Sequence, residues 1–270
     1  MLLLSAALSS PVWSQTAPAS APAPTAVAKV NQPADRPATR TGGWSGIHNR
    51  LVALAKGGNI DLYFEGDSIT DYWGRDNRPD TSHPFKESFQ KYFGGWKAAN
   101  FGVAADRTEN VLWRITNGEL DGVKPKVIVL LIGTNNLPKD MQNYLPKTPA
   151  EDAAGVKAIL EVMKEKQPQA KILLMSVFPR EDKINASNPE YREDLNPKIK
   201  ELNALLAKFD DGKQIKFLDI YDKFLGPDGK LLPGTFTDRL HPSMKGYDIW
   251  AQAMLPILTE WLGPPATQPK

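Results

Sequence analysis

The sequence predicts an α/β fold in which a five-stranded parallel sheet lies between two layers of helices, a three-layer α/β/α sandwich. Two observations predict it. Short apolar runs alternate along the chain with helical patterns, and this alternation is typical of parallel strands joined by crossover helices. The runs are also nearly continuous in apolar residues, as in strands buried on both faces. The five runs cover residues 60–64, 97–101, 127–132, 172–177 and 215–220.

The helices are predicted from apolar residues that recur at intervals of three and four. Before the first strand, such a pattern runs from Trp44 to Leu54 and ends at two consecutive glycines. Thr148 and Glu151 form a capping-box pattern, with Pro149 at the first helical position. The remaining helical patterns cover residues 85–93, 109–116, 149–166, 195–209 and 243–262.

The beginning of the chain differs in composition from the rest. Residues 1–15 resemble the remnant of a secretory signal peptide, because an apolar stretch too short to span a bilayer precedes small and polar residues, although no basic residue comes before it. Residues 16–43 are rich in Ala, Pro, Thr and Ser and predict a disordered linker. We therefore expect one catalytic domain over residues 44–264, a short tail over 265–270, and a secreted or periplasmic location.

Composition excludes several classes of partner and chemistry. The 33 basic and 31 acidic residues are spread along the chain and leave a net charge of +2, so we expect neither a nucleic acid partner nor stable membrane insertion. The absence of cysteine excludes disulfides, a thiolate nucleophile and cysteine-ligated zinc. No glycine-rich nucleotide motif follows a strand, and no cofactor is expected. The oligomeric state stays open, a homodimer included.

Candidate catalytic residues follow the first and the last of the predicted strands, at the edge where open parallel sheets bind ligands. Ser68 directly follows the first strand in the run Gly66-Asp67-Ser68, and Asp238 lies three residues before His241 after the fifth. A serine hydroxyl needs a base to take its proton, and imidazole suits this role near neutral pH. We predict Ser68 as nucleophile, His241 as base and Asp238 as the carboxylate that orients the base.

A tetrahedral intermediate also needs hydrogen-bond donors for its oxyanion. The backbone amide of Ser68 is one candidate, the backbone amide of Gly102 after the second strand is another, and the side-chain amide of Asn135 after the third is the last. Glycine lets a ligand approach the backbone without a Cβ in the way. A turn glycine and a capping asparagine are the structural alternatives at these positions.

Two further residues are candidates for substrate binding. Trp73, five residues after Ser68, either stacks on a sugar ring or packs the loop that leaves the strand. Arg107 either contacts substrate oxygens or is an ordinary loop charge. A metal-dependent hydrolase is the rival reading of the acidic residues, but their spacing matches no usual zinc or magnesium pattern. No metal is expected.

Four short blocks in order resemble the sequence blocks of the SGNH hydrolases, also called the GDSL esterase and lipase superfamily. They are Gly-Asp-Ser-Ile at 66–69, Gly102, Gly-Thr-Asn-Asn at 133–136, and Asp-Arg-Leu-His at 238–241. The resemblance implies a flavodoxin-like sandwich and an ester hydrolase without a cofactor. It also implies the roles of nucleophile, oxyanion donors, base and orienting acid for Ser68, Gly102, Asn135, His241 and Asp238, in that order. Ile69 replaces the leucine of the family's name.

A longer stretch, residues 100–115 and 124–129, is similar to the catalytic subunit of platelet-activating-factor acetylhydrolase and to its bacterial relatives. This resemblance implies short acyl groups, acetyl above all. We expect a serine esterase that hydrolyses acetyl esters of carbohydrate through an acyl-enzyme intermediate. A lysophospholipase or acetylhydrolase-like lipid esterase is the alternative, and a noncatalytic carbohydrate-binding module is the alternative of another class.

Overall fold

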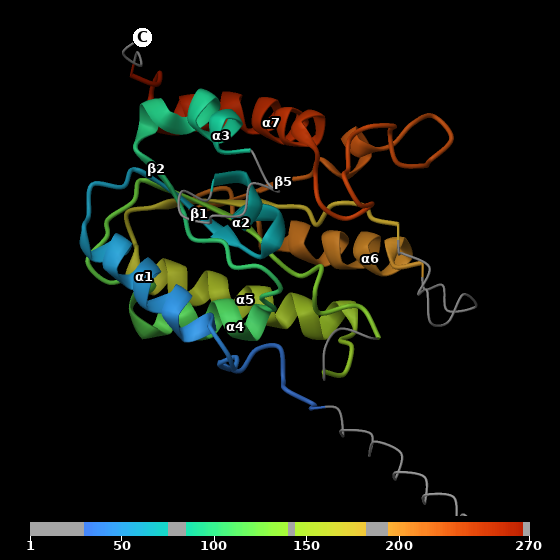
Figure 1. The fold of residues 1–270 in the computed structure, drawn as a ribbon, viewed down its shortest axis with the longest axis horizontal. Coiled ribbons are helices and arrows are strands. Elements are labelled where there is room, and N and C mark those ends of the chain that lie inside the picture. The colour runs from blue at the N-terminus through green and yellow to red at the C-terminus, as the bar shows by residue number, and fades with distance from the viewer. Residues whose placement is uncertain (1–29, 75–84, 140–143, 182–193, 267–270) are drawn as a thin grey trace, which may run out of the picture.

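The computed structural model describes residues 30–74, 85–139, 144–181 and 194–266, and a five-stranded parallel sheet runs through its centre (Figure 1). Its strands lie in the order β2-β1-β3-β4-β5, the flavodoxin-like order, which confirms the predicted fold class. The order reverses between β1 and β3, so the crevice beyond the carboxyl end of β1 is where this fold binds ligands. The strands are β1 (Leu62–Gly66), β2 (Ala98–Asn100), β3 (Val127–Leu131), β4 (Lys171–Met175) and β5 (Ile215–Leu218).

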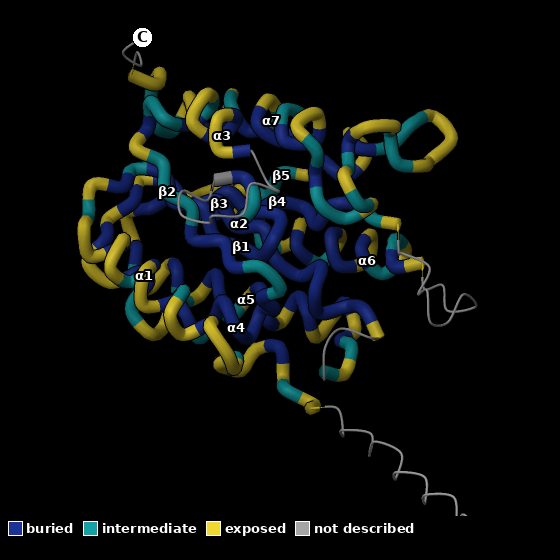
Figure 2. Tube along the Cα trace, viewed as in Figure 1, coloured by how far each residue is buried: buried dark blue, intermediate teal, exposed yellow. Residues whose placement is uncertain are grey.

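Helices cover both faces of the sheet (Figure 1). One face carries α1 (Trp44–Lys56), α4 (Thr108–Arg114), α5 (Pro149–Lys166) and α6 (Asn196–Leu206). The other carries α2 (Ser68–Gly74), α3 (Lys86–Phe93) and α7 (Met244–Leu262). Figure 2 shows the sheet as the buried centre of the molecule and the outer sides of the helices as its exposed surface.

The two cores take alternate residues of the same strands. In β1, Tyr63 packs towards α1 and α4, whereas Leu62 and Phe64 pack towards α3 and α7. In β3, Ile128 belongs to the first core and Val129 to the second. Successive side chains of a strand point to opposite faces, so β1 and β3, which are buried at every position between the two helical layers, have no exposed position for a polar residue. This explains the continuous apolar runs in the sequence.

Local signals fix the ends of the longer helices. Thr148 Oγ1 accepts the amide hydrogen of Glu151 at 3.2 Å, and the Glu151 carboxylate accepts the amide hydrogen of Thr148 at 2.9 Å, so the predicted capping box is present. At the start of α7, Ser243 Oγ accepts the amide hydrogen of Gly246. The predicted helix over 195–209 forms as α6 followed by a short 3₁₀ turn over Ala207–Phe209.

Residues 30–43 correct the predicted linker, because they lie ordered along the start of α4. The Ala34 carbonyl accepts a hydrogen bond from Thr108 Oγ1 at 3.1 Å, and the Ala38 amide donates to the Glu109 carbonyl at 3.0 Å. Arg40 Nη1 donates to Asp106 at 2.8 Å. Composition describes side chains, and this segment is held largely through its backbone. The signal-like residues 1–15 and residues 16–29 lie outside the described part of the chain.

Within the residues that the structure describes, no helix is both long and apolar enough to cross a membrane. At the other end of the chain, part of the predicted tail is in contact with the domain, since the Ala266 amide donates to the Gly95 carbonyl at 3.1 Å.

Candidate active site

The serine, histidine and aspartate predicted from the sequence meet at the carboxyl edge of the sheet. Ser68 is the first residue of α2, directly after β1, and His241 reaches it from the loop before α7. His241 Nε2 lies 2.9 Å from Ser68 Oγ, and His241 Nδ1 lies 2.9 Å from Asp238 Oδ2. These two hydrogen bonds connect the three side chains in series, although Ser68 and His241 lie 173 positions apart in the sequence.

The loop that carries Asp238 and His241 is held by hydrogen bonds between the Asp238 side chain and the backbone of the same loop. Asp238 Oδ1 accepts the amide hydrogens of His241 at 2.8 Å and of Leu240 at 3.2 Å. Arg239 between them has a left-handed backbone with φ of 72°, which turns the chain tightly enough for both bonds. Burial opposes ionisation of Asp238, but hydrogen bonds from the His241 amide and imidazole outweigh it and lower the pKa of Asp238 to about 2. The carboxylate is therefore ionised over the whole neutral range.

The turn from β1 into α2 is fixed by Asp67. Its Oδ1 accepts the Ile69 amide hydrogen at 2.9 Å, and its carbonyl accepts the Asp71 amide hydrogen at 2.8 Å. From α7, the Tyr247 hydroxyl donates to the Ile69 carbonyl at 2.8 Å. Ser68 itself is 5% exposed. Burial of Asp67 raises the pKa of its carboxyl to about 7, against the lowering effect of the Ile69 amide.

Gly102 lies against the backbone of α2, and only glycine fits there. A Cβ at this position would lie 2.4 Å from the Asp71 nitrogen and 2.9 Å from the Asp67 carbonyl oxygen. The Gly102 amide donates its hydrogen to Asn100 Oδ1 at 2.9 Å, and Asn100 Nδ2 donates to the Thr70 carbonyl at 2.6 Å. Asn100 thus links the exit of β2 to the helix that carries the serine.

Asn135 follows β3 and is 3% exposed. Its Nδ2 donates to the Asp106 carbonyl at 2.9 Å, which orients the side-chain amide. The next residue, Asn136, has a different environment: its Oδ1 accepts the Thr108 amide hydrogen at 3.1 Å, and its Nδ2 donates to Glu109 at 3.0 Å. Asn136 therefore fastens the loop to α4, and Asn135 alone of the two is a candidate oxyanion donor.

The predicted contact of Trp73 with substrate is wrong. Trp73 is fully buried, its ring centre lies 4.7 Å from that of Tyr247 and 4.6 Å from that of Trp250, and its Nε1 donates to Ser88 Oγ at 3.3 Å. It belongs to the aromatic core between α2, α3 and α7. A side chain enclosed on all sides has no face left for a sugar ring.

The predicted contact of Arg107 with substrate is also wrong. Arg107 is 2% exposed, its Nε donates to Glu109 Oε1 at 2.7 Å, and its Nη2 donates to the Leu145 carbonyl at 3.3 Å. Its guanidinium also lies 5.0 Å from the ring centre of Tyr144. The charge is used inside the protein, at the start of α4.

Two residues near the triad were not predicted. The ring of Tyr72 lies 4.8 Å from that of His241, with an angle of 41° between the rings. Tyr72 is four residues after Ser68, so helical periodicity places both on one face of α2, a signal that was present in the sequence. Arg180 follows β4, and its Nη1 lies 3.3 Å from Thr134 Oγ1 beside Asn135.

Comparison with known proteins relates this arrangement to a family. The model of the GDSL-like lipase/acylhydrolase family matches residues 64–249, which include the serine, the glycine, the asparagine, the aspartate and the histidine discussed above. The chain belongs to this family. It is thus a GDSL-family acylhydrolase.

Several known proteins are similar to this chain over most of their own length. The alpha2 subunit of platelet-activating factor acetylhydrolase IB from Rattus norvegicus is 33% identical over 204 residues, 76% of this chain and 78% of the relative. A GDSL-like lipase from Bacteroides thetaiotaomicron has a similar fold, with a TM-score of 0.61, 19% identity and coverage of 79% of this chain and 97% of that one. The acetyl xylan esterase AlAXEase has a TM-score of 0.55, 21% identity and coverage of 74% and 100%.

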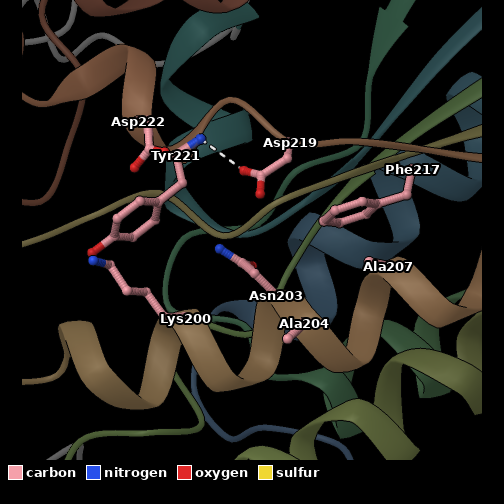
Figure 3. Close-up of a pocket in the computed structure, with 8 residues that line it drawn as sticks. All are labelled: Lys200, Asn203, Ala204, Ala207, Phe217, Asp219, Tyr221 and Asp222. Carbon is pink, nitrogen blue, oxygen red and sulfur yellow. Dashed lines mark hydrogen bonds between the residues drawn. The ribbon is translucent and has the colours of Figure 1, made fainter.

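A separate cavity of about 310 Å³ lies between α6 and β5 (Figure 3). In the figure, the Asn203 side chain points up from α6 between the rings of Phe217 and Tyr221. Neither Ser68 nor His241 is among its lining residues. Across the described ranges, no group of three or more His, Asp or Glu side chains is arranged to hold a metal ion. The cavity is lined by Lys200, Asn203, Ala204, Ala207, Phe217, Asp219, Tyr221 and Asp222.

Proposed function

We propose that this acylhydrolase is a serine esterase that removes acetyl groups from carbohydrate esters through an acyl-enzyme intermediate on Ser68. The observation that carries the proposal is the continuous hydrogen-bonded chain from Ser68 Oγ through His241 to Asp238, with both contacts at 2.9 Å. A nucleophile, a base within hydrogen-bond reach and a third group that orients the base are the arrangement that covalent acyl transfer requires.

In the first half of the reaction, Ser68 Oγ attacks the ester carbonyl carbon while His241 Nε2 takes the hydroxyl proton. Asp238 holds the Nδ1 hydrogen and stabilises the imidazolium that forms. His241 then gives its proton to the departing alcohol oxygen as the carbon–oxygen bond of the ester breaks. In the second half, water attacks the acyl-serine with His241 as base, acetate leaves, and the proton returns to Ser68.

Three groups are suited to stabilise the oxyanion. The backbone amide of Ser68 lies at the start of α2. One hydrogen of Asn135 Nδ2 is donated to the Asp106 carbonyl, and this bond fixes the direction of the second Nδ2 hydrogen. The Gly102 amide already donates to Asn100, so it serves the oxyanion by sharing its hydrogen between two acceptors. Ser68 and Asn135 are therefore the main donors and Gly102 is the weaker one.

The choice of an acetyl group is supported by the relatives named above, since a platelet-activating factor acetylhydrolase and an acetyl xylan esterase both carry acetyl in their names. The choice of a carbohydrate is supported by the acetyl xylan esterase and by the signal-like residues 1–15, which are consistent with a secreted or periplasmic location. The relative of higher identity is, by its name, a platelet-activating factor acetylhydrolase, and a lipid ester is therefore the second candidate substrate.

The test is acetate release from three substrates by the full chain, with Ser68→Ala as control: acetylated xylan, a short-chain acetyl phosphocholine lipid and p-nitrophenyl acetate. A parallel p-nitrophenyl series from acetyl to octanoyl measures the acyl preference. We expect the acetyl ester to be preferred and acetylated xylan to be hydrolysed faster than the lipid. Faster turnover of the lipid would replace the carbohydrate assignment, and unchanged turnover in Ser68→Ala would overturn the mechanism.

A further inference from the structure

We propose that Arg114 is a positioning residue that aligns the three oxyanion donors without touching the substrate. The inference rests on the proposed function and deepens it. Arg114 is the last residue of α4, on the face of the sheet that also carries α1 and α5, and it is fully buried. Its planar guanidinium donates in several fixed directions at once, a geometry that a lysine ammonium does not reproduce.

The guanidinium joins three segments of backbone that are distant in the sequence. Nη1 donates to the Phe101 carbonyl at 2.9 Å, at the exit of β2. Nη2 donates to Glu65 Oε1 at 2.6 Å and lies 3.4 Å from the Gly66 carbonyl, both at the end of β1. Nε donates to Asp106 Oδ2 at 2.7 Å.

Each of these segments leads directly to one oxyanion donor. Gly66 is two residues before Ser68, and Phe101 immediately precedes Gly102. The carbonyl of Asp106 accepts the hydrogen bond that orients Asn135. One side chain thus sets the relative position of three donors that come from the loops after β1, β2 and β3. Oxyanion stabilisation depends on donors that are fixed before the reaction begins, so a shift of any one segment weakens it.

The charges around Arg114 make the arrangement stiff. Glu119 contacts Nη1, and Asp106 also accepts Arg40 Nη1 at 2.8 Å. Burial raises the pKa of Glu65, and the guanidinium of Arg114 opposes this rise. The guanidinium groups of Arg114 and Arg40 both face Asp106, and Arg114 also faces Glu119. A buried cation paired in this way cannot leave its partners without exposing uncompensated charge.

A role limited to stability is the competing explanation, and His48 provides the matched control. His48 Nδ1 lies 2.9 Å from Glu119 Oε1, at the end of the same network that is remote from the sheet. The side chain of His48 lies in α1 and contacts the Asn117 carbonyl on its other side. Its replacement disturbs the buried network without altering a segment that leads to an oxyanion donor.

The experiment compares Arg114→Lys with His48→Gln in the full chain, at a temperature far below the melting temperature of each variant. The substrate is p-nitrophenyl acetate, and the inhibitor is a boronate that forms a tetrahedral adduct with the serine. We expect Arg114→Lys to lower kcat by about 10- to 100-fold with KM changed by less than about threefold, since the donors remain but are misaligned. Its affinity for the boronate should fall by a similar factor. His48→Gln should lower the melting temperature and leave kcat and boronate affinity within about twofold.

Asp106→Asn extends the test in case Arg114→Lys does not fold. The asparagine keeps an oxygen for Arg40 and Trp44 and turns an amide group towards Arg114 Nε, so it removes the contact with Arg114 selectively. We expect a smaller loss of kcat and of boronate affinity. Unchanged kcat in a folded Arg114→Lys or Asp106→Asn variant overturns the inference alone. A wild type that does not turn over any ester overturns the proposed function together with it.

Discussion

Asn100 Oδ1 accepts the amide hydrogen of Gly102 at 2.9 Å, and the same side chain donates to the Thr70 carbonyl at 2.6 Å. This pair of bonds ties the glycine after β2 to α2, whose first residue is Ser68. The glycine is therefore part of the packing of the site as well as a source of an amide. A change at this position acts on the nucleophile through the helix that carries it.

Gly102→Ala should lower kcat strongly, because its Cβ would lie 2.4 Å from the Asp71 nitrogen and must displace α2. The measurement is the rate of p-nitrophenyl acetate hydrolysis together with the rate of Ser68 labelling by a fluorophosphonate. Gly46→Ala in α1 is the control, since its added Cβ meets nothing within 4 Å and should change neither rate. Normal labelling of Gly102→Ala would contradict the packing argument.

Asn135→Ala should lower kcat by about 100- to 1000-fold and leave KM nearly unchanged, as expected for a donor that acts on the transition state. Asn136→Ala is the contrasting variant. It removes the bonds to Thr108 and Glu109 and should cost about 1–3 kcal/mol of unfolding free energy, with a much smaller effect on kcat. Steady-state kinetics and urea unfolding of both variants separate the two roles. A loss confined to KM in Asn135→Ala would argue against the donor role.

Asp238→Asn should reduce kcat less than His241→Ala does. The asparagine oxygen can still accept the backbone hydrogens of Leu240 and His241 and preserve the loop, whereas alanine at 241 removes the base itself. The ranking is read from kcat/KM of the two variants at one pH. A more severe loss in Asp238→Asn would mean that the carboxylate does more than orient the imidazole.

Asp67 makes the stability of the protein depend on pH. Burial raises the pKa of its carboxyl from an ordinary value near 4 to about 7, so the folded state keeps a proton that the unfolded chain has lost. Its contribution to the free energy of unfolding is full below about pH 4 and is lost as the pH rises to about 7. Asp67→Asn should flatten this decline, by an amount on the order of a few kcal/mol. Urea unfolding of both proteins between pH 4 and 8 measures it.

Glu65 extends the same effect to higher pH and provides a comparison. Burial raises its pKa to about 8, so its contribution continues to fall above the range of Asp67. Glu65→Gln should therefore reduce the decline that remains between about pH 7 and 8 in Asp67→Asn. An unfolding free energy that rises over this whole range in the wild type would contradict both pKa assignments.

Most of the fold was predictable because its signals are local. The capping box at Thr148 predicted the start of α5 to the residue, and the short, largely apolar runs predicted all five strands to within two residues at each end. The ordered segment 30–43 was not predictable, because its bonds to α4 are made by the backbone groups of Ala34 and Ala38, whose partners lie more than sixty residues away. Composition alone contains no record of such contacts.

The site residues divide in the same way. Ser68, Asp238 and His241 come together as expected, because strands of a parallel sheet deliver their following loops to one edge. Trp73 and Arg107 were assigned by their nearness in sequence to the site, and both are buried. Helical geometry explains Trp73: Tyr72, four residues after Ser68, shares its side of α2, whereas the next residue turns into the core.

The helix that begins with Ser68 therefore has two different sides: Ser68 and Tyr72 lie on the side of the active site, and Trp73 lies on the side packed in the aromatic core. Trp73 packs against side chains from α3 and α7, and this packing fixes the helix that carries Ser68 five positions earlier. We therefore expect loops that carry none of the site residues to tolerate substitution, because Ser68 is positioned by α2 and the core behind it. Such changes would alter which ester alcohols fit at the rim of the site and leave the position of Ser68 unchanged.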